Sequence, residues 1–349
     1  MKQAYLFTLL AILCWTTGPV GSKAALLSGG QPALGPLQVA FWAIAAGAVV
    51  LWLWVLAGRR AGLLGGIAAR GWPVLALMGV TGWFGYPVAI NFAYTRMPLA
   101  DALVVCYAAP VFVVVFQAPA FGRVLRLVSG WEAECKRQVH AGQVGLGLGL
   151  CLLGVAFTAT GGQPTRLASL HLGVGALSAL LAAVLWGIYS NLGRFVPVCP
   201  HAEGAARGDV QSAAGMVCGL ACMGGLLAAG HRLAPPLGYS SLLHLGPWGQ
   251  ASVPVVGIVA VMGLFNYAVG YPLWMHALEL GEKAGGAHRL PALNYLLLLL
   301  SVVLGWLLLR QGFGPGFWPG AACIAAGNLV NLWPRGERIA KSHRSGPCP

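Results

Sequence analysis

Aromatic and amide side chains lie inside long apolar segments of this chain, and these are the residues that could do chemistry. Asparagine offers hydrogen-bond donors and acceptors without charge, and tyrosine and tryptophan offer flat apolar walls with one polar atom. Such groups are costly at membrane depth unless they have partners or a function. A set of this kind suits a neutral or zwitterionic planar solute better than a strongly charged one. The ten candidate binding residues are Trp15, Tyr86, Asn91, Tyr107, Trp186, Tyr189, Asn266, Tyr271, Trp274 and Asn294.

Packing is the alternative explanation for each of these residues. Asparagine often joins membrane helices by hydrogen bonds, which applies to Asn91, Asn191 and Asn294. Tryptophan is also common at the membrane surface, and this is the alternative for Trp83.

The elements that carry the candidates must be membrane helices. The chain has 349 residues, of which 58% are hydrophobic and only 8% are charged. Its mean hydropathy is +0.76. A soluble domain carries about a quarter charged residues, so the chain cannot cover a water-facing surface. The net charge of +13 does not indicate nucleic-acid binding, because the basic residues lie in short breaks between apolar runs. The nine cysteines show no disulfide or zinc pattern, and we expect no metal and no cofactor.

Pro, Gly and charged residues divide the chain into ten apolar segments of about membrane-spanning length. The predicted spans are approximately 4–25, 36–57, 72–94, 100–121, 142–160, 170–194, 210–229, 253–278, 288–309 and 314–332. If both termini are cytoplasmic, only five of the 21 Lys and Arg residues fall in outer segments. Positive residues favour the cytoplasmic side, which supports this count and orientation.

Two parts of the chain echo each other. The segment Leu9–Trp15 reappears as Leu180–Trp186, and a Gly-Tyr-Pro triplet that ends at Pro87 reappears ending at Pro272. Trp15 and Trp186 thus occupy matching places, which favours positions that face a central axis. Each half holds five helices, an odd number, so the second half enters the membrane from the opposite face. Inverted repeats of this kind are typical of transporters, with the substrate site between them. Because proline loosens a helix, Pro87 and Pro272 are candidate hinges.

These features predict an all-α integral membrane protein with ten transmembrane helices as two inverted five-helix repeats. The predicted parts are a first repeat, 1–165, a second repeat, 166–333, and a basic cytoplasmic tail, 334–349.

The layout resembles the EamA-type members of the drug/metabolite transporter superfamily. The resemblance rests on the five-plus-five arrangement, the Leu-Leu-Ala-x-x-x-Trp openings and the Gly-rich fifth and tenth helices, and it covers roughly residues 4–333. Ala33-Leu-Gly-Pro36, Trp274 and Phe317-Trp-Pro-Gly-Ala321 resemble the branch of aromatic-amino-acid exporters. The chain departs from the EamA pattern at Phe41-Trp42, where the second helix often carries an arginine. The resemblance implies a multi-pass permease that exports a small metabolite, with an amino-acid-like solute as the first expectation.

The charged residues limit how transport could be coupled. All eight acidic residues fall in loops or at helix ends, so we expect facilitated flux rather than proton coupling. If protons or charge are coupled, the candidates are Asp101, His276, Glu279 and Arg289, together with His288.

Two alternatives stay open. A carrier of anions such as nucleotide sugars or sugar phosphates would use Lys23, Arg96 or Arg289 as charge partners. A non-transporting receptor or an intramembrane enzyme is the other class. The chain has no HExxH, no paired acids at membrane depth and no GxxxxGK[ST] loop, so we expect no enzyme. The expected partners are a small-molecule substrate and the lipid bilayer of a bacterial inner membrane, with no nucleic acid and a monomer or weak dimer.

Overall fold

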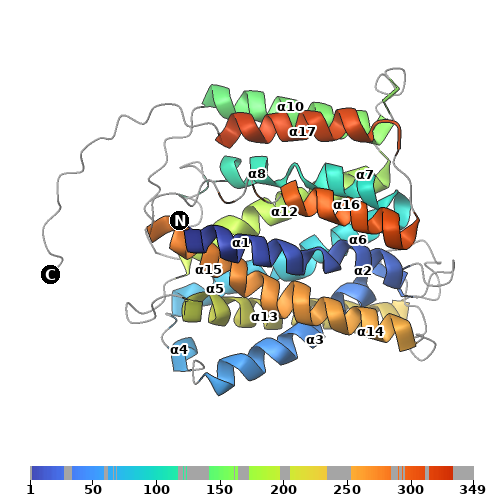
Figure 1. Ribbon diagram of the computed structural model, residues 1–349. Coiled ribbons are helices and arrows are strands. Elements are labelled where there is room, and N and C mark those ends of the chain that lie inside the picture. Colours follow the sequence, from blue (N-terminus) through green and yellow to red (C-terminus); the bar gives the residue numbers. More distant parts are fainter. Residues whose placement is uncertain are drawn as a thin grey trace, which may run out of the picture.

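We describe the protein from a computed structural model, drawn in Figure 1. It describes residues 2–26, 34–58, 62–65, 69–116, 141–160, 173–196, 205–233, 253–283, 295–310 and 314–332, and a few single residues between these ranges. Five predictions lie outside the described residues: the repeat boundary at 165, the tail 334–349, and the candidates His288, Arg289 and Asn294.

The regular elements of the described part are helices. The elements before residue 165 are α1 (Lys2–Trp15), α2 (Thr17–Leu26), α3 (Pro36–Ala57), α4 (Gly62–Gly65), η2 (Ala69–Gly71), α5 (Trp72–Met78), η3 (Gly79–Gly85), α6 (Tyr86–Arg96), α7 (Leu99–Cys106), α8 (Ala109–Val115) and α10 (Ala141–Thr160). The elements after it are α12 (Val174–Leu192), η4 (Gly193–Phe195), α13 (Ala205–Leu233), α14 (Val253–Val261), η6 (Met262–Gly270), α15 (Tyr271–Lys283), α16 (Tyr295–Leu309) and α17 (Phe317–Leu332).

The chain is an all-helical membrane protein. Six helical stretches of the described part are long and apolar enough to cross a membrane, and four shorter apolar helices accompany them. Each of the ten predicted spans overlaps one of these stretches. The count of ten spans stays a prediction, because the other four apolar stretches found among the described residues are shorter than the six.

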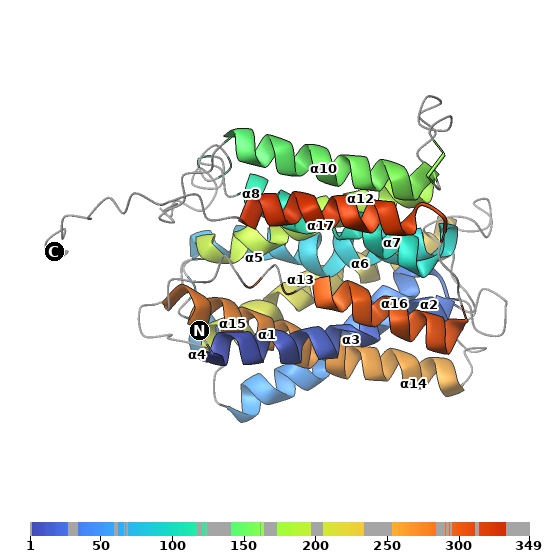
Figure 2. The ribbon, with the colours of Figure 1, turned by 45° about the horizontal axis from the view of Figure 1, so that its top comes forward.

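The outer surface is apolar, which explains the low charge. Leu53, Trp54 and Leu308 are each at least 60% exposed, and many other large apolar side chains face outward. Lipid chains solvate such a surface, whereas water would not. The long helices run roughly along one common direction, and α10 and α17 lie side by side at one edge (Figures 1 and 2).

Two of the long stretches contain a wide π-helical turn before a Tyr-Pro pair. The segment η3 precedes Tyr86 and Pro87, and η6 precedes Tyr271 and Pro272. Proline has no amide hydrogen and cannot complete the normal α-helical ladder. The amide of Tyr86 reaches back five residues, to the carbonyl of Thr81, which is the π-helical pattern. Such local widening is common at functional sites.

Glycine allows close helix crossings at the start of both π-helical segments. A Cβ at Gly79 would lie 2.9 Å from the carbonyl oxygen of Gly215 in α13, and a Cβ at Gly263 would lie 2.8 Å from that of Ala43 in α3. Side chains larger than hydrogen would push the helices apart at both places. The two crossings hold η3 and η6 against the centre of the bundle, where the candidate site lies.

Candidate functional site

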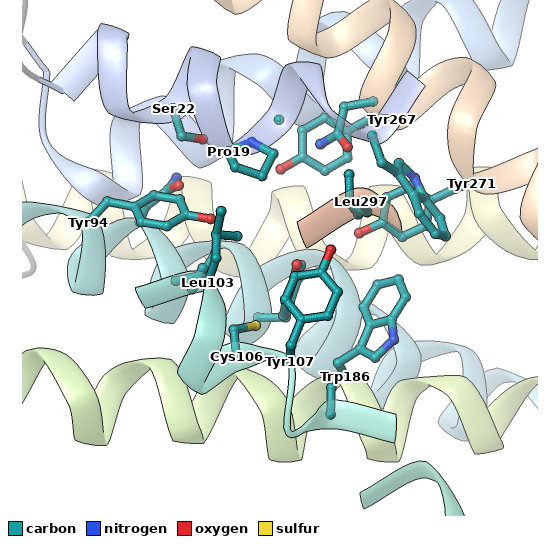
Figure 3. Close-up of a pocket in the computed structure, with 17 residues that line it drawn as sticks. Pro19, Ser22, Tyr94, Leu103, Cys106, Tyr107, Trp186, Tyr267, Tyr271 and Leu297 are labelled. Carbon is teal, nitrogen blue, oxygen red and sulfur yellow. The ribbon is translucent and has the colours of Figure 1, made fainter. Parts of the chain in front are cut away.

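A pocket lies at the centre of the bundle, between helices from both ends of the chain (Figure 3). Its walls come from α1 and α2, α6, the junction of α7 and α8, α12, η6 with α15, and α16. Seven of the ten predicted binding residues line it: Trp15, Tyr86, Asn91, Tyr107, Trp186, Asn266 and Tyr271.

One end of the pocket is a cluster of aromatic rings. The Trp15 ring centroid lies 5.8 Å from that of Trp186 and 5.6 Å from that of Tyr271, both edge to face. The Tyr86 ring lies 5.0 Å from Trp186. Offset and edge-to-face arrangements are the favoured geometries for aromatic pairs, so the cluster can extend to a further flat ring. Trp15 also keeps a buried indole N–H that has no hydrogen-bond partner in the part of the chain described.

The opposite end of the pocket is polar but uncharged. Figure 3 places Ser22 and Tyr94 beside Pro19 at this end, and Asn91, also a lining residue, lies one helical turn before Tyr94 on α6. The Nδ2 atom of Asn91 donates to the carbonyl of Pro36 at 3.3 Å, which fixes the amide while leaving its oxygen as an acceptor.

Asn266 of η6 contributes a second amide to the pocket, and Gly18 makes room for it. A Cβ at position 18 would lie 2.9 Å from both the amide carbon and Nδ2 of Asn266. The amide therefore rests against the backbone of α2. Any larger residue at position 18 would displace it.

Among the described residues that line this pocket there is no aspartate, glutamate, lysine, arginine or histidine. The nearby cations contact other groups. The Lys23 ammonium is buried and donates to the carbonyls of Tyr94 and Met97 at the end of α6, the latter at 3.1 Å. A cation at a helix C-terminus is favourable, which accounts for its burial. The Arg96 guanidinium lies 5.1 Å from the ring centroid of Phe92.

Three of the predicted coupling residues are described by the structure, and none of the three is among the residues that line the pocket. Asp101, in the first turn of α7, accepts the backbone N–H of Gly314, and its Oδ1 is buried without a partner among the described residues. His276 packs edge to face on Phe7, with ring centroids 4.7 Å apart. Glu279 is half-buried on α15.

Two predicted binding residues stand behind the pocket wall rather than in it. Trp274 is 5.5 Å from Trp15, and Tyr189 is 5.5 Å from Trp186 (centroid distances), so both support rings that do line the pocket. The buried Trp83 lies 4.3 Å from Tyr271 and is part of this supporting layer. Trp83 therefore lies in the interior of the protein and not at the membrane surface, which was the alternative explanation for it.

Sequence reasoning missed several lining residues, chiefly Gly18, Ser22, Tyr94 and Tyr267. A signal for some of them was present. Tyr94 lies three residues after Asn91, on the same helix face, and Tyr267 directly follows Asn266. Gly18 and Ser22, also one turn apart, carried no comparable signal, because small residues are frequent throughout membrane helices.

Comparisons with known proteins agree with this architecture. Residues 2–131 match the EamA-like transporter family. The aromatic amino acid exporter YddG of Ancylobacter novellus is 26% identical over 329 residues, which cover 94% of this chain and 95% of that protein. A solved structure, described only as "Crystal structure of protein", matches with a TM-score of 0.58 at 23% identity, covering 94% of this chain and 96% of that chain. The last similarity concerns the fold alone.

Proposed function

We propose that this chain is a member of the EamA-like transporter family, which residues 2–131 match, and that it exports a small amino-acid-like metabolite by alternating access. In this proposal the chain is a multi-pass membrane transporter rather than an enzyme, which the match of residues 2–131 supports. The substrate, the direction and the mechanism are the finer parts of the proposal.

The uncharged pocket with one aromatic and one polar end is the observation that carries the substrate class. A planar side chain would stack among Trp15, Trp186 and Tyr271, and the indole N–H of Trp15 supplies a donor there. The ammonium and carboxylate of a zwitterion cancel in net charge, so they require dipoles rather than a buried counter-ion. The amides of Asn91 and Asn266 provide such dipoles.

The name of the relative supports a substrate with an aromatic side chain and transport out of the cell. A protein that covers almost the same length as this chain is named an aromatic amino acid exporter. We extend that substrate to this chain as a proposal because the ring cluster fits it.

Paired contacts support the two inverted repeats, 1–165 and 166–333, on which alternating access would depend. The crossing of η3 with α13 at Gly79 has a counterpart in the crossing of η6 with α3 at Gly263. Counting predicted spans, the first joins the third to the seventh, and the second joins the eighth to the second. A two-fold axis that exchanges the repeats would exchange these pairs. In this proposal Pro87 and Pro272, next to the π-helical segments, are the hinges, and both termini face the cytoplasm of a bacterium.

The anionic alternative has less support. Lys23 donates to backbone carbonyls, Arg96 lies over a phenylalanine ring, and neither is among the described residues that line the pocket. The third candidate charge partner, Arg289, lies outside the described residues. Facilitated flux remains the simpler mode of coupling, with Asp101, His276 and Glu279 as the residues to test if proton dependence is found.

Uptake into proteoliposomes tests the proposal. The labelled solutes would be L-phenylalanine, L-leucine, a sugar phosphate and a quaternary ammonium ion, each with and without a pH gradient. We expect saturable flux of phenylalanine that does not require the gradient. Saturable flux of only the sugar phosphate would overturn the substrate class, and strict dependence on the gradient would overturn facilitated transport.

A further inference from the structure

The fourth predicted span is interrupted where it meets the pocket, between α7 and α8. In a continuous helix the amide of Val111 would donate to the carbonyl of Tyr107, four residues earlier. Here it donates to the carbonyl of Ala108 at 3.0 Å. Pro110 has no amide hydrogen and cannot repair the ladder. The break brings Tyr107 to the pocket wall.

Asn328 of α17 replaces the missing backbone donor. Its Nδ2 lies 3.3 Å from the carbonyl oxygen of Tyr107 and 2.8 Å from that of Ile324 in its own helix. The Asn328 side chain is fully buried, and α17 contributes no residue to the pocket. At membrane depth a backbone carbonyl needs a partner, so this contact fixes the position of the break.

Asn191 of α12 holds the other side of the break in a similar way. Its Nδ2 donates to the carbonyl of Val113 in α8 at 3.0 Å and to that of Gly187 at 2.8 Å. Gly187 lets α12 approach, because a Cβ there would lie 2.6 Å from that of Phe112. Two asparagines from two different helices thus secure the two halves of one interrupted span.

We infer that Asn328 is a positioning residue for substrate binding, which acts on the pocket from outside it through the backbone of Tyr107. The inference rests on the proposed function for its transport readout. Loss of the amide removes one hydrogen bond from the Tyr107 carbonyl, so the Tyr107 ring and the neighbouring Cys106 thiol, both in the pocket wall, change position. The expected consequence is weaker substrate binding with little change in maximal flux.

The test compares Asn328→Leu with Ile324→Ala. Leucine removes the donor at similar side-chain volume. The control removes a buried side chain that packs on Gly154 of α10 but leaves the Asn328 amide in place. Both variants are made in a background that keeps only Cys106 and Cys151, because the Asn328 Nδ2 also lies 3.7 Å from the Cys151 Sγ, and a protein that keeps only Cys151 gives the background reaction rate. The readouts are the rate at which Cys106 reacts with methyl methanethiosulfonate, and the KM and Vmax of phenylalanine flux.

We expect Asn328→Leu to change the Cys106 reaction rate and raise KM, each by roughly three- to tenfold, which is the size expected for one lost hydrogen bond. Vmax should stay within about twofold, the control should match the parent in both readouts, and Asn328→Gln, which keeps an amide donor, should recover part of the loss. A parental Cys106 rate in Asn328→Leu would overturn the inference. So would failure of both Asn328→Leu and Asn328→Ala to fold while Ile324→Ala folds, because the role would then be purely structural. If the parent moves no phenylalanine, the proposed function fails, but the Cys106 rate still decides this inference.

Discussion

Two helix crossings in this protein use the same backbone device but place different side chains beside it. At the crossing of η3 with α13, Trp83 covers two glycines, and Cβ atoms at Gly215 and Gly219 would lie 2.7 Å and 2.6 Å from its side chain. At the crossing of η6 with α3, Tyr267 covers Gly47, where a Cβ would lie 2.7 Å from that of the tyrosine. Trp83 is fully buried and does not line the pocket, whereas Tyr267 does.

The surroundings of the two crossings differ as well. In the apolar window of Trp72–Arg96, 61% of the residues are buried, against 39% for Val253–Gly281. The first stretch is therefore mostly core, while the second faces outward on one side and the pocket on the other. The same backbone geometry thus contributes to stability at one crossing and to the pocket wall at the other. The side chain beside the crossing determines which of the two it does.

Removal of the Trp83 ring should have the largest effect on stability. Trp83→Ala leaves a large cavity between η3 and α13, for which we expect a loss of about 3 to 5 kcal/mol. Thermal unfolding in detergent would measure it, with the lipid-facing Trp306→Ala as the matched control. Trp306 is 55% exposed, so its loss should have little effect. Equal destabilisation by the two variants would contradict the assignment of Trp83 to the core.

Replacing the glycines at the two crossings with alanine should have the next largest effect on stability. We expect Gly79→Ala and Gly263→Ala each to cost about 1 to 3 kcal/mol, because the new methyl group meets backbone atoms of the facing helix. Gly257→Ala in α14 is the control, since no other group lies within 4 Å of a Cβ there. Unfolding temperatures provide the comparison. A lower unfolding temperature for only one of the two variants would show that the crossings are not equivalent.

Alanine at Gly18 should affect binding more than folding. Its methyl group would meet the flexible Asn266 side chain rather than backbone, so the amide can turn away. We expect KM for phenylalanine to rise roughly tenfold, equivalent to about 1.4 kcal/mol, with a smaller change in unfolding temperature. An unchanged KM would remove Asn266 from the site.

The smallest effect should come from the Tyr267 hydroxyl. Tyr267→Phe keeps the ring that packs over Gly47 and deletes one polar atom at the pocket. We expect a change in KM of roughly two- to tenfold and no measurable loss of stability. A large loss of stability with an unchanged KM would place Tyr267 with Trp83 as a core residue and would remove the contrast between the two crossings.

Much of this architecture could be predicted from the sequence, because membrane helices are encoded by long apolar runs. The same holds for residues whose chemistry is unusual at membrane depth, since seven of the ten predicted binding residues line one pocket. The paired Gly-Tyr-Pro triplets indicated matching elements, but not the π-helical turns that precede them.

The remaining parts of the site depend on packing between distant segments. The fit of Gly18 to Asn266 and the donation from Asn328 to Tyr107 join residues more than 200 positions apart, and neither partner is distinctive alone. Lys23 shows the opposite case. The charge of Lys23 suggested an anionic partner. In the structure its ammonium group instead donates to backbone carbonyls at the end of α6.

Equilibrium binding of labelled L-phenylalanine to the purified protein tests most directly whether the uncharged aromatic pocket binds the substrate. The comparison is between the parent chain, Trp186→Ala in the pocket wall and Trp306→Ala on the lipid-facing surface. The account predicts saturable binding in the parent and in Trp306→Ala, and an affinity at least about tenfold weaker in Trp186→Ala. Equal affinity in all three proteins, or no saturable binding in the parent, would contradict it.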